Sequence, residues 1–153
     1  MRKLIFLDID GVLCTGNHMQ KLSDNGEKWF KALDPECVSR FNKLVAETGA
    51  DVVVSSTWRL SHGSHGRLAE ELLGKGVVAN IIGMTPILHN RNLDATRGDE
   101  IAAWIAGNKF DGKFVIIDDD DDMGDLWVFL VQTDFLNGLT DRDCDKIKIV
   151  LNE

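Results

Sequence analysis

Five short apolar runs recur along the chain, and the segments between them have helical periodicity. The runs are continuous rather than alternating, which favours strands that are covered on both faces. They lie at residues 4–7, 52–54, 77–82, 114–117 and 127–131. This alternation predicts an α/β domain of three layers, Rossmann-like, with a central, mostly parallel five-stranded sheet.

Helix signals lie between these runs. Asp34 can cap a helix that begins at Pro35 and ends before Gly49. Thr140 and Asp143 form a capping-box pattern at the start of a last helix. Two further helices are expected around residues 68–73 and 101–105.

Composition narrows the class of protein. The chain has 153 residues, 44% hydrophobic and 27% charged, and a net charge of −8, which predicts a soluble protein without broad nucleic-acid binding. Its longest apolar run, residues 126–131, is far shorter than the roughly 20 residues needed to cross a bilayer, so we expect a cytoplasmic protein. Three cysteines without C-x-x-C spacing indicate neither a disulfide framework nor a zinc knuckle.

Two acidic residues follow the first apolar run. Asp8 and Asp10 point the same way from an extended backbone, and Gly11 then allows a turn. A solvated Asp-Gly turn is the plain alternative. Because unused charges at the end of a buried strand are costly, we interpret the pair as functional.

Five consecutive acids, residues 118–122, follow the fourth run. Such a run is usually a solvated face, but here it ends at the same edge of the sheet as Asp8 and Asp10. Carboxylates that converge there repel one another unless a divalent cation is present, and oxygen ligands favour Mg²⁺. A calcium loop is excluded, because its sixth and twelfth positions would be Met123 and Phe129.

Hydroxyl groups and arginines offer donors to an anion. Ser55 and Ser56 follow the second run, with Arg59 close behind, and Arg97 opens the helix at 101–105. In isolation, the segment 55–59 is interpreted equally well as a hydroxyl-rich turn that caps the next helix, and Arg97 as part of a surface salt bridge. Three histidines are interpreted as surface residues rather than ligands or bases: His62, His65 and His89.

Together these segments resemble the four motifs of the haloacid dehalogenase (HAD) superfamily, in order and over nearly the whole chain. The first and second motifs correspond to residues 8–12 and to Ser55 or Ser56, the third to Arg97, and the fourth to Asp118, Asp119 and Asp122. Finer details are similar to a HAD branch grouped with RNA-repair proteins, at residues 55–59, 83–86, 97–101 and 138–140.

The resemblance implies a magnesium-dependent phosphohydrolase. Asp8 would form an aspartyl-phosphate, and Asp10 would act as general acid and base. Ser55 or Ser56 and Arg97, with Arg59 as a rival, would bind the phosphate. The metal ligands would come from Asp8, Asp10, Asp118, Asp119 and Asp122.

Neither gap between the motifs can hold a full cap domain. Residues 1–153 are therefore expected to form a single HAD-like domain, in which 13–35 is a small cap insert or a loop. An open site suits phosphates on nucleotides or nucleic-acid ends. The alternatives are a small-metabolite phosphomonoesterase and a catalytically idle binding module; oligomeric state is not predicted.

A receiver domain is the other acidic doubly wound fold. It would need an acceptor Asp after the third strand and a Lys after the fifth, where this chain has Gly83 and Gln132. We reject that reading.

Overall fold

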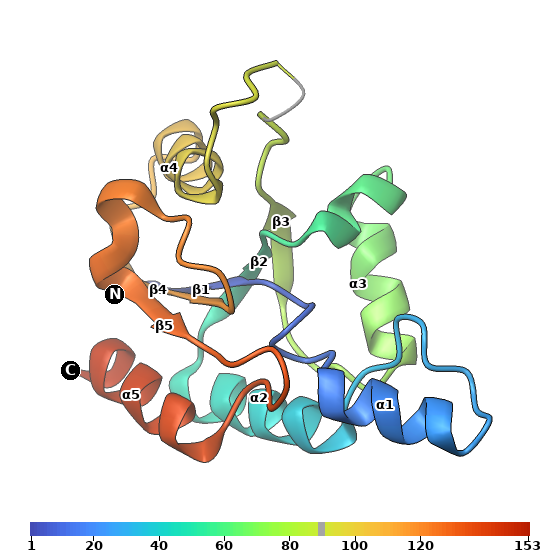
Figure 1. The fold of residues 1–153 in the computed structure, drawn as a ribbon. Helices are drawn as coiled ribbons and strands as arrows, with labels where there is room; N and C mark the ends of the chain where they lie inside the picture. Colours follow the sequence, from blue (N-terminus) through green and yellow to red (C-terminus); the bar gives the residue numbers. More distant parts are fainter. Residues whose placement is uncertain (89–90) are drawn as a thin grey trace.

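The computed structural model describes residues 1–88 and 91–153, so His89 lies outside the described residues. It contains a five-stranded, all-parallel sheet of order β3-β2-β1-β4-β5 (Figure 1), which confirms the predicted fold class. The strands are β1 (Lys3–Leu7), β2 (Asp51–Val54), β3 (Ile81–Met84), β4 (Lys113–Asp118) and β5 (Leu130–Gln132).

Helices cover both faces of this sheet (Figure 1). They are α1 (Gly16–Asp24), α2 (Pro35–Thr48), α3 (His65–Gly74), α4 (Arg97–Gly107) and α5 (Asp141–Asn152), with short 3₁₀ turns η1 (Thr57–Ser61) and η2 (Gly124–Phe129). None of the described helices is long and apolar enough to cross a membrane.

Two hydrophobic clusters, one on each face, explain the continuous apolar runs. In β1, Ile5 and Leu7 belong to the cluster that includes side chains of α2, α3 and α5. Leu4 and Phe6 belong to the other cluster, with side chains of α4. A strand buried on both faces has no solvent side, so its sequence does not alternate.

The expected helix signals are confirmed. The Asp34 side chain accepts a hydrogen bond from the Glu36 amide, and α2 ends at Gly49 in the left-handed conformation. Thr140 and Asp143 form the capping box of α5.

Two strand boundaries are wrong. The third strand does not begin at residue 77, because Val77 closes α3 through a bond from its amide to the Leu72 carbonyl (2.9 Å). The fifth strand begins only at Leu130, since the preceding apolar residues form η2, where Trp127 is exposed. An apolar run alone does not distinguish a strand from a short helical turn.

Helix α1 is missing from the sequence-based prediction. It lies in the segment 13–35 and has no buried residue, and Met19 and Leu22 are its only large apolar side chains, which are too few to mark a helix in the sequence. Thr15 caps it by accepting from the His18 amide (3.1 Å).

Candidate active site

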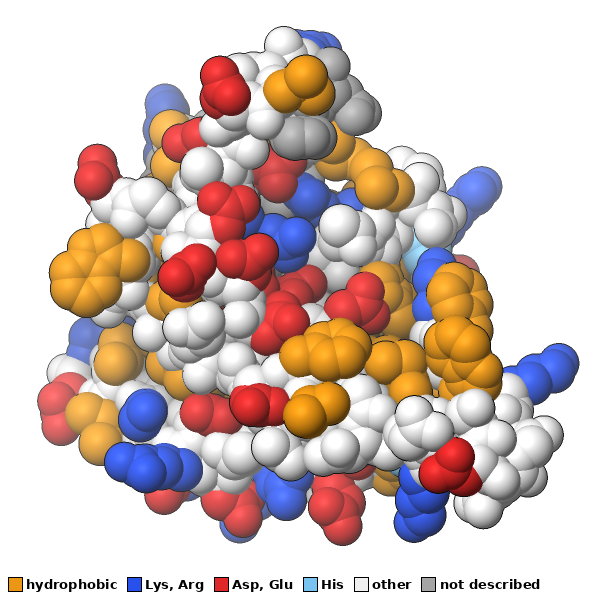
Figure 2. Space-filling model, viewed as in Figure 1, with side chains coloured by type: hydrophobic (Ala, Val, Ile, Leu, Met, Phe, Trp, Pro, Cys, Tyr) orange, Lys and Arg blue, Asp and Glu red, His pale blue; other side chains and the backbone are white. Residues whose placement is uncertain are grey.

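The strand register brings three of the predicted site residues together. Leu7 is level with Val54 of β2 and with Ile117 of β4. The residue after each of these three therefore emerges at the carboxyl edge of the sheet, side by side with the others: Asp8, Ser55 and Asp118. Figure 2 shows acidic side chains gathered in the middle of this face.

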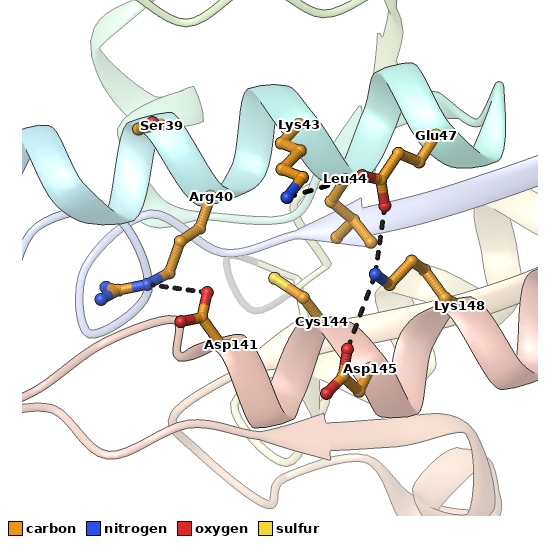
Figure 3. A pocket seen from close by; sticks show the side chains of 9 residues that line it. All are labelled: Ser39, Arg40, Lys43, Leu44, Glu47, Asp141, Cys144, Asp145 and Lys148. Carbon is orange, nitrogen blue, oxygen red and sulfur yellow. Dashed lines mark hydrogen bonds and ion pairs between the residues drawn. The ribbon is translucent and has the colours of Figure 1, made fainter.

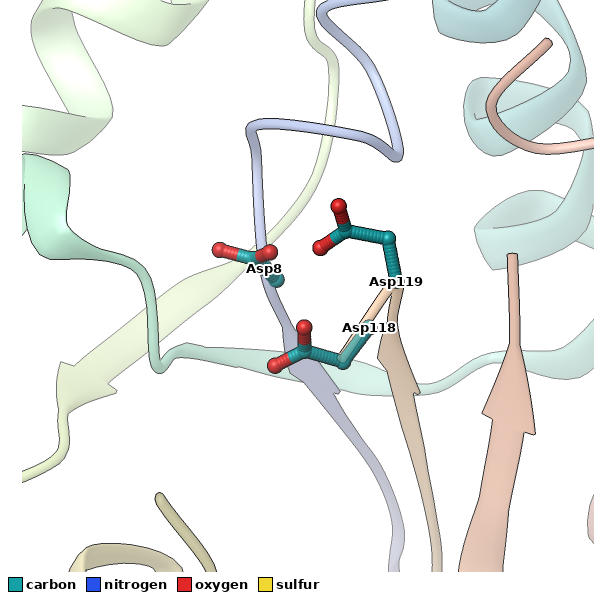
Figure 4. Close-up of side chains that lie close together, drawn as sticks. All are labelled: Asp8, Asp118 and Asp119. Carbon is teal, nitrogen blue, oxygen red and sulfur yellow. The ribbon is translucent and has the colours of Figure 1, made fainter. Parts of the chain in front are cut away.

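Three aspartates form the centre of the site. Carboxylate oxygens of Asp8, Asp118 and Asp119 lie within 4.8 Å of one another (Figure 4). Burial raises the pKa of the Asp8 carboxyl to about 6, although Arg97 opposes the shift. Burial, with the nearby charge of Asp8, raises the pKa of Asp118 to about 8. The two carboxylates thus repel each other in a poorly solvated place.

Arg97 enters this cluster from the first turn of α4. Its guanidinium Nη1 donates to Asp8 Oδ1 (3.1 Å) and to Asp118 Oδ2 (3.3 Å). Asp122 holds the start of α4, since its Oδ2 accepts from the Arg97 amide (3.2 Å) and its carbonyl from the Gly98 amide (3.0 Å). Asp122 thus positions Arg97 and lies outside the three-carboxylate cluster.

Asp10 lies beside the cluster rather than in it. Its Oδ1 accepts from the indole Nε1 of Trp58 (3.0 Å). Gly11 makes the turn that follows, with φ of 81°. A Cβ at Gly11 would lie 2.4 Å from the Asp119 carboxyl carbon, so only glycine lets that carboxylate approach the turn.

The two serines of the second motif differ in their surroundings. Both are fully buried. Ser56 Oγ accepts from the Trp58 amide (3.2 Å) and so caps η1. Ser55 Oγ has no hydrogen-bond partner among the described residues, although its amide donates to the Leu7 carbonyl (2.9 Å). A buried hydroxyl without a partner is available to an incoming oxygen.

Arg59, the rival of Arg97, is engaged in a separate buried network. Its Nε donates to the Ser56 carbonyl (2.7 Å), and its Nη2 pairs with Glu100 Oε1 (3.1 Å). Nη1 donates to the carbonyl and hydroxyl oxygens of Thr85. The guanidinium is thus occupied in joining η1, the end of β3 and α4.

Several contributors to the site were not found from the sequence. Thr133, after β5, donates from its hydroxyl to the Gly11 carbonyl (2.6 Å) and from its amide to the Asp118 carbonyl (3.0 Å). Its place directly after a strand was the available signal. Trp58 lies in the segment 55–59 that resembles the RNA-repair branch, but nothing in the sequence indicated that its indole N–H donates to Asp10. His62, interpreted above as a surface residue, pairs with Glu71 (2.8 Å) and lies 2.9 Å from the Trp58 carbonyl oxygen.

The three-carboxylate cluster fits a hard divalent cation. Its donors are all oxygens, two of the three residues are buried, and one guanidinium faces two of the carboxylates. A cation would offset the burial and the nearby negative charge that raise the two pKa values. Asp8, Asp118 and Asp119 are therefore the residues that could hold Mg²⁺.

A doubly wound parallel sheet with paired aspartates after its central strand and more after the next strand defines a domain of the HAD type. The chain belongs to the family of the HAD domain in Swiss Army Knife RNA repair proteins, whose sequence model matches residues 4–144. The match confirms the resemblance to the superfamily, and its range spans the segments of the four predicted motifs. No curated protein and no solved structure matches the chain significantly.

The contrast between the two arginines gives a prediction. We expect Arg97→Ala to lower the turnover of a phosphate ester by about 10²-fold or more, because it removes a charged donor from the site. We expect Arg59→Ala to lower the free energy of unfolding by about 3–5 kcal/mol, because Glu100 would be left buried and unpaired. Denaturant unfolding with Mg²⁺ present, together with steady-state kinetics, measures both effects. The reverse pattern would make Arg59 the phosphate ligand.

Proposed function

We propose that the protein is a magnesium-dependent phosphohydrolase that acts through an aspartyl-phosphate on nucleotide or nucleic-acid-end phosphates. The observation that carries this is the buried Asp8 carboxylate, which shares the Arg97 guanidinium with a second buried carboxylate, Asp118. Ser55, with its unpartnered hydroxyl, follows the adjacent strand. Such a set can attract, orient and attack a phosphoryl group.

The chemistry divides into two displacements. A carboxylate oxygen of Asp8 bonds to phosphorus while the bond from phosphorus to the leaving oxygen breaks, and Asp10 gives its proton to that oxygen. Asp10 then takes a proton from water, whose oxygen attacks phosphorus and releases inorganic phosphate and the Asp8 carboxylate. Trp58 keeps the Asp10 carboxyl oriented for both transfers through its indole N–H.

The remaining residues hold the non-bridging oxygens. Ser55 donates from its hydroxyl and Arg97 from its guanidinium, which offsets charge in the transition state. Mg²⁺, held by Asp8, Asp118 and Asp119 with the carbonyl of Asp10, would supply the positive charge that brings an anionic phosphate to an anionic nucleophile. The net charge of −8 makes that contribution essential.

The substrate is narrowed by the shape of the chain and by its family. The segment 13–35 contains one short helix and a loop, so it leaves room for a bulky phosphorylated end. The family is named for RNA repair proteins, which favours a nucleotide or a nucleic-acid end as the substrate. A small phosphate ester is the second candidate, because the acidic surface does not favour long nucleic acids.

Phosphate release from an aryl phosphate and from a 3′-phosphorylated oligonucleotide, with Mg²⁺ or with chelator, tests this proposal. We expect release that depends on Mg²⁺ and is faster with the oligonucleotide. Faster release from the aryl phosphate would favour the small-ester reading. Absence of release from both, by protein shown to be folded, would contradict the phosphohydrolase.

A further inference from the structure

A cavity of about 540 Å³ opens directly beside Asp10 and has a largely apolar lining. Three of its aromatic residues are partly in solvent rather than in the core: Trp29 is 47% exposed, Phe30 75% and Phe135 45%. Figure 2 shows hydrophobic side chains gathered beside the acidic centre of this face. Exposed aromatic side chains concentrated at a cavity indicate a binding site.

The cavity is continuous with the catalytic centre. Trp58 forms part of its wall and also donates to the Asp10 carboxylate (3.0 Å). In the proposed mechanism Asp10 protonates the leaving oxygen. The group attached to that oxygen therefore lies on the side where the cavity opens.

The ring geometry suits a flat partner. Trp29 and Phe30 are nearly perpendicular, with centroids 6.3 Å apart, so each presents a face in a different direction. The Lys31 ammonium lies 5.7 Å from the Phe30 centroid and 5.2 Å from that of Trp58. In a protein of net charge −8, this places a cation where an anionic ligand would enter.

We propose that Trp29, Phe30 and Phe135 form a base-stacking subsite, which binds the nucleobase of the nucleotide whose phosphate is removed. This inference rests on the proposed function and adds its substrate class. Stacking on aromatic side chains contributes about 1–3 kcal/mol per base and tolerates every base. A nucleobase offers a flat π-face to such rings, which a polyol leaving group lacks.

A second cavity, about 350 Å³, carries no comparable argument. It lies between α2 and α5 and shares no lining residue with the first cavity (Figure 3). Its charged groups pair with each other, as in Arg40 with Asp141 (3.3 Å) and Lys148 with Glu47 (3.1 Å). These ion pairs account for the groove without a ligand.

Binding to the Asp8→Asn chain tests the subsite without turnover. Dissociation constants for adenosine 5′- and 3′-monophosphate and for ribose 5-phosphate are measured from the ligands' own NMR signals with Mg²⁺ present. Of the two nucleotides, we expect the one that binds more tightly to have a lower dissociation constant than ribose 5-phosphate. The double substitution Trp29→Ala with Phe30→Ala should reduce the ratio of these two constants about tenfold. Trp29→Phe should restore part of it. The matched control is Trp127→Ala, an exposed tryptophan outside the cavity.

The outcomes separate the two proposals. If nucleotide binding depends on Trp29 but the wild-type protein releases no phosphate, the base-stacking subsite is upheld and the proposed phosphohydrolase activity is refuted. Nucleotide binding no better than that of ribose 5-phosphate, or equal losses in the Trp127→Ala control, would overturn the subsite, even if phosphate esters are hydrolysed.

Discussion

The Asp8→Asn protein should release phosphate at least about 10³-fold more slowly than the wild type. Asparagine has nearly the same shape as aspartate, and its Oδ1 can still accept from Arg97, which bonds Asp8 in the native protein (3.1 Å). Its neutral amide is too weak a nucleophile to attack phosphorus as the Asp8 carboxylate does. The loss therefore falls on turnover, and single-turnover rates with saturating Mg²⁺ measure it.

The same variant should keep its fold. Asp8 and Asp118 are two buried carboxylates that share one positive charge, the Arg97 guanidinium. Removing the charge of Asp8 therefore lowers the repulsion between them. We expect an unfolding temperature no lower than that of the wild type. Asp111→Asn, an exposed change just before β4, is the matched control and should alter neither quantity. Turnover retained by Asp8→Asn would refute the nucleophile assignment.

The central acids of the site could be predicted because the information is local. Asp8 and Asp118 end buried parallel strands, and parallel strands bring such residues to one edge. The spacing of Asp8 and Asp10, and the glycine after them, are equally visible. These features depend only on where each strand stops.

The rest depends on packing between distant segments. Arg59 and Arg97 look alike in the sequence, and only their different ion-pair partners in the folded chain separate them. Within the acidic run, the turn after β4 decides that Asp119 faces the site whereas Asp122 holds α4. Trp29 and Phe30, which line the cavity beside Asp10, lie in a loop without periodicity. No local rule assigns such residues to a site.

The free energy of unfolding of the metal-free protein should have a component that falls as pH rises from about 4 to about 8. The pKa of Asp8 is raised to about 6 and that of Asp118 to about 8, whereas unfolded carboxyls titrate near their ordinary value. The folded state thus binds more protons in this range, and stability is lost on deprotonation. We expect a component of several kcal/mol, since one pKa unit corresponds to about 1.4 kcal/mol.

Mg²⁺ should remove most of this loss, because the cation replaces the protons as the partner of the buried carboxylates. Its stabilising effect is therefore expected to be larger at pH 8.5 than at pH 5.5. Denaturant unfolding at both pH values, with Mg²⁺ or with chelator, measures it. Asp8→Asn isolates the pair from the other acids, since it removes one raised pKa and the charge that helps to raise the other. If the stability of Asp8→Asn and of Asp111→Asn depends on pH as that of the wild type does, the Asp8–Asp118 pair is not the source of the pH dependence. That result would also weigh against a metal site at the three-carboxylate cluster.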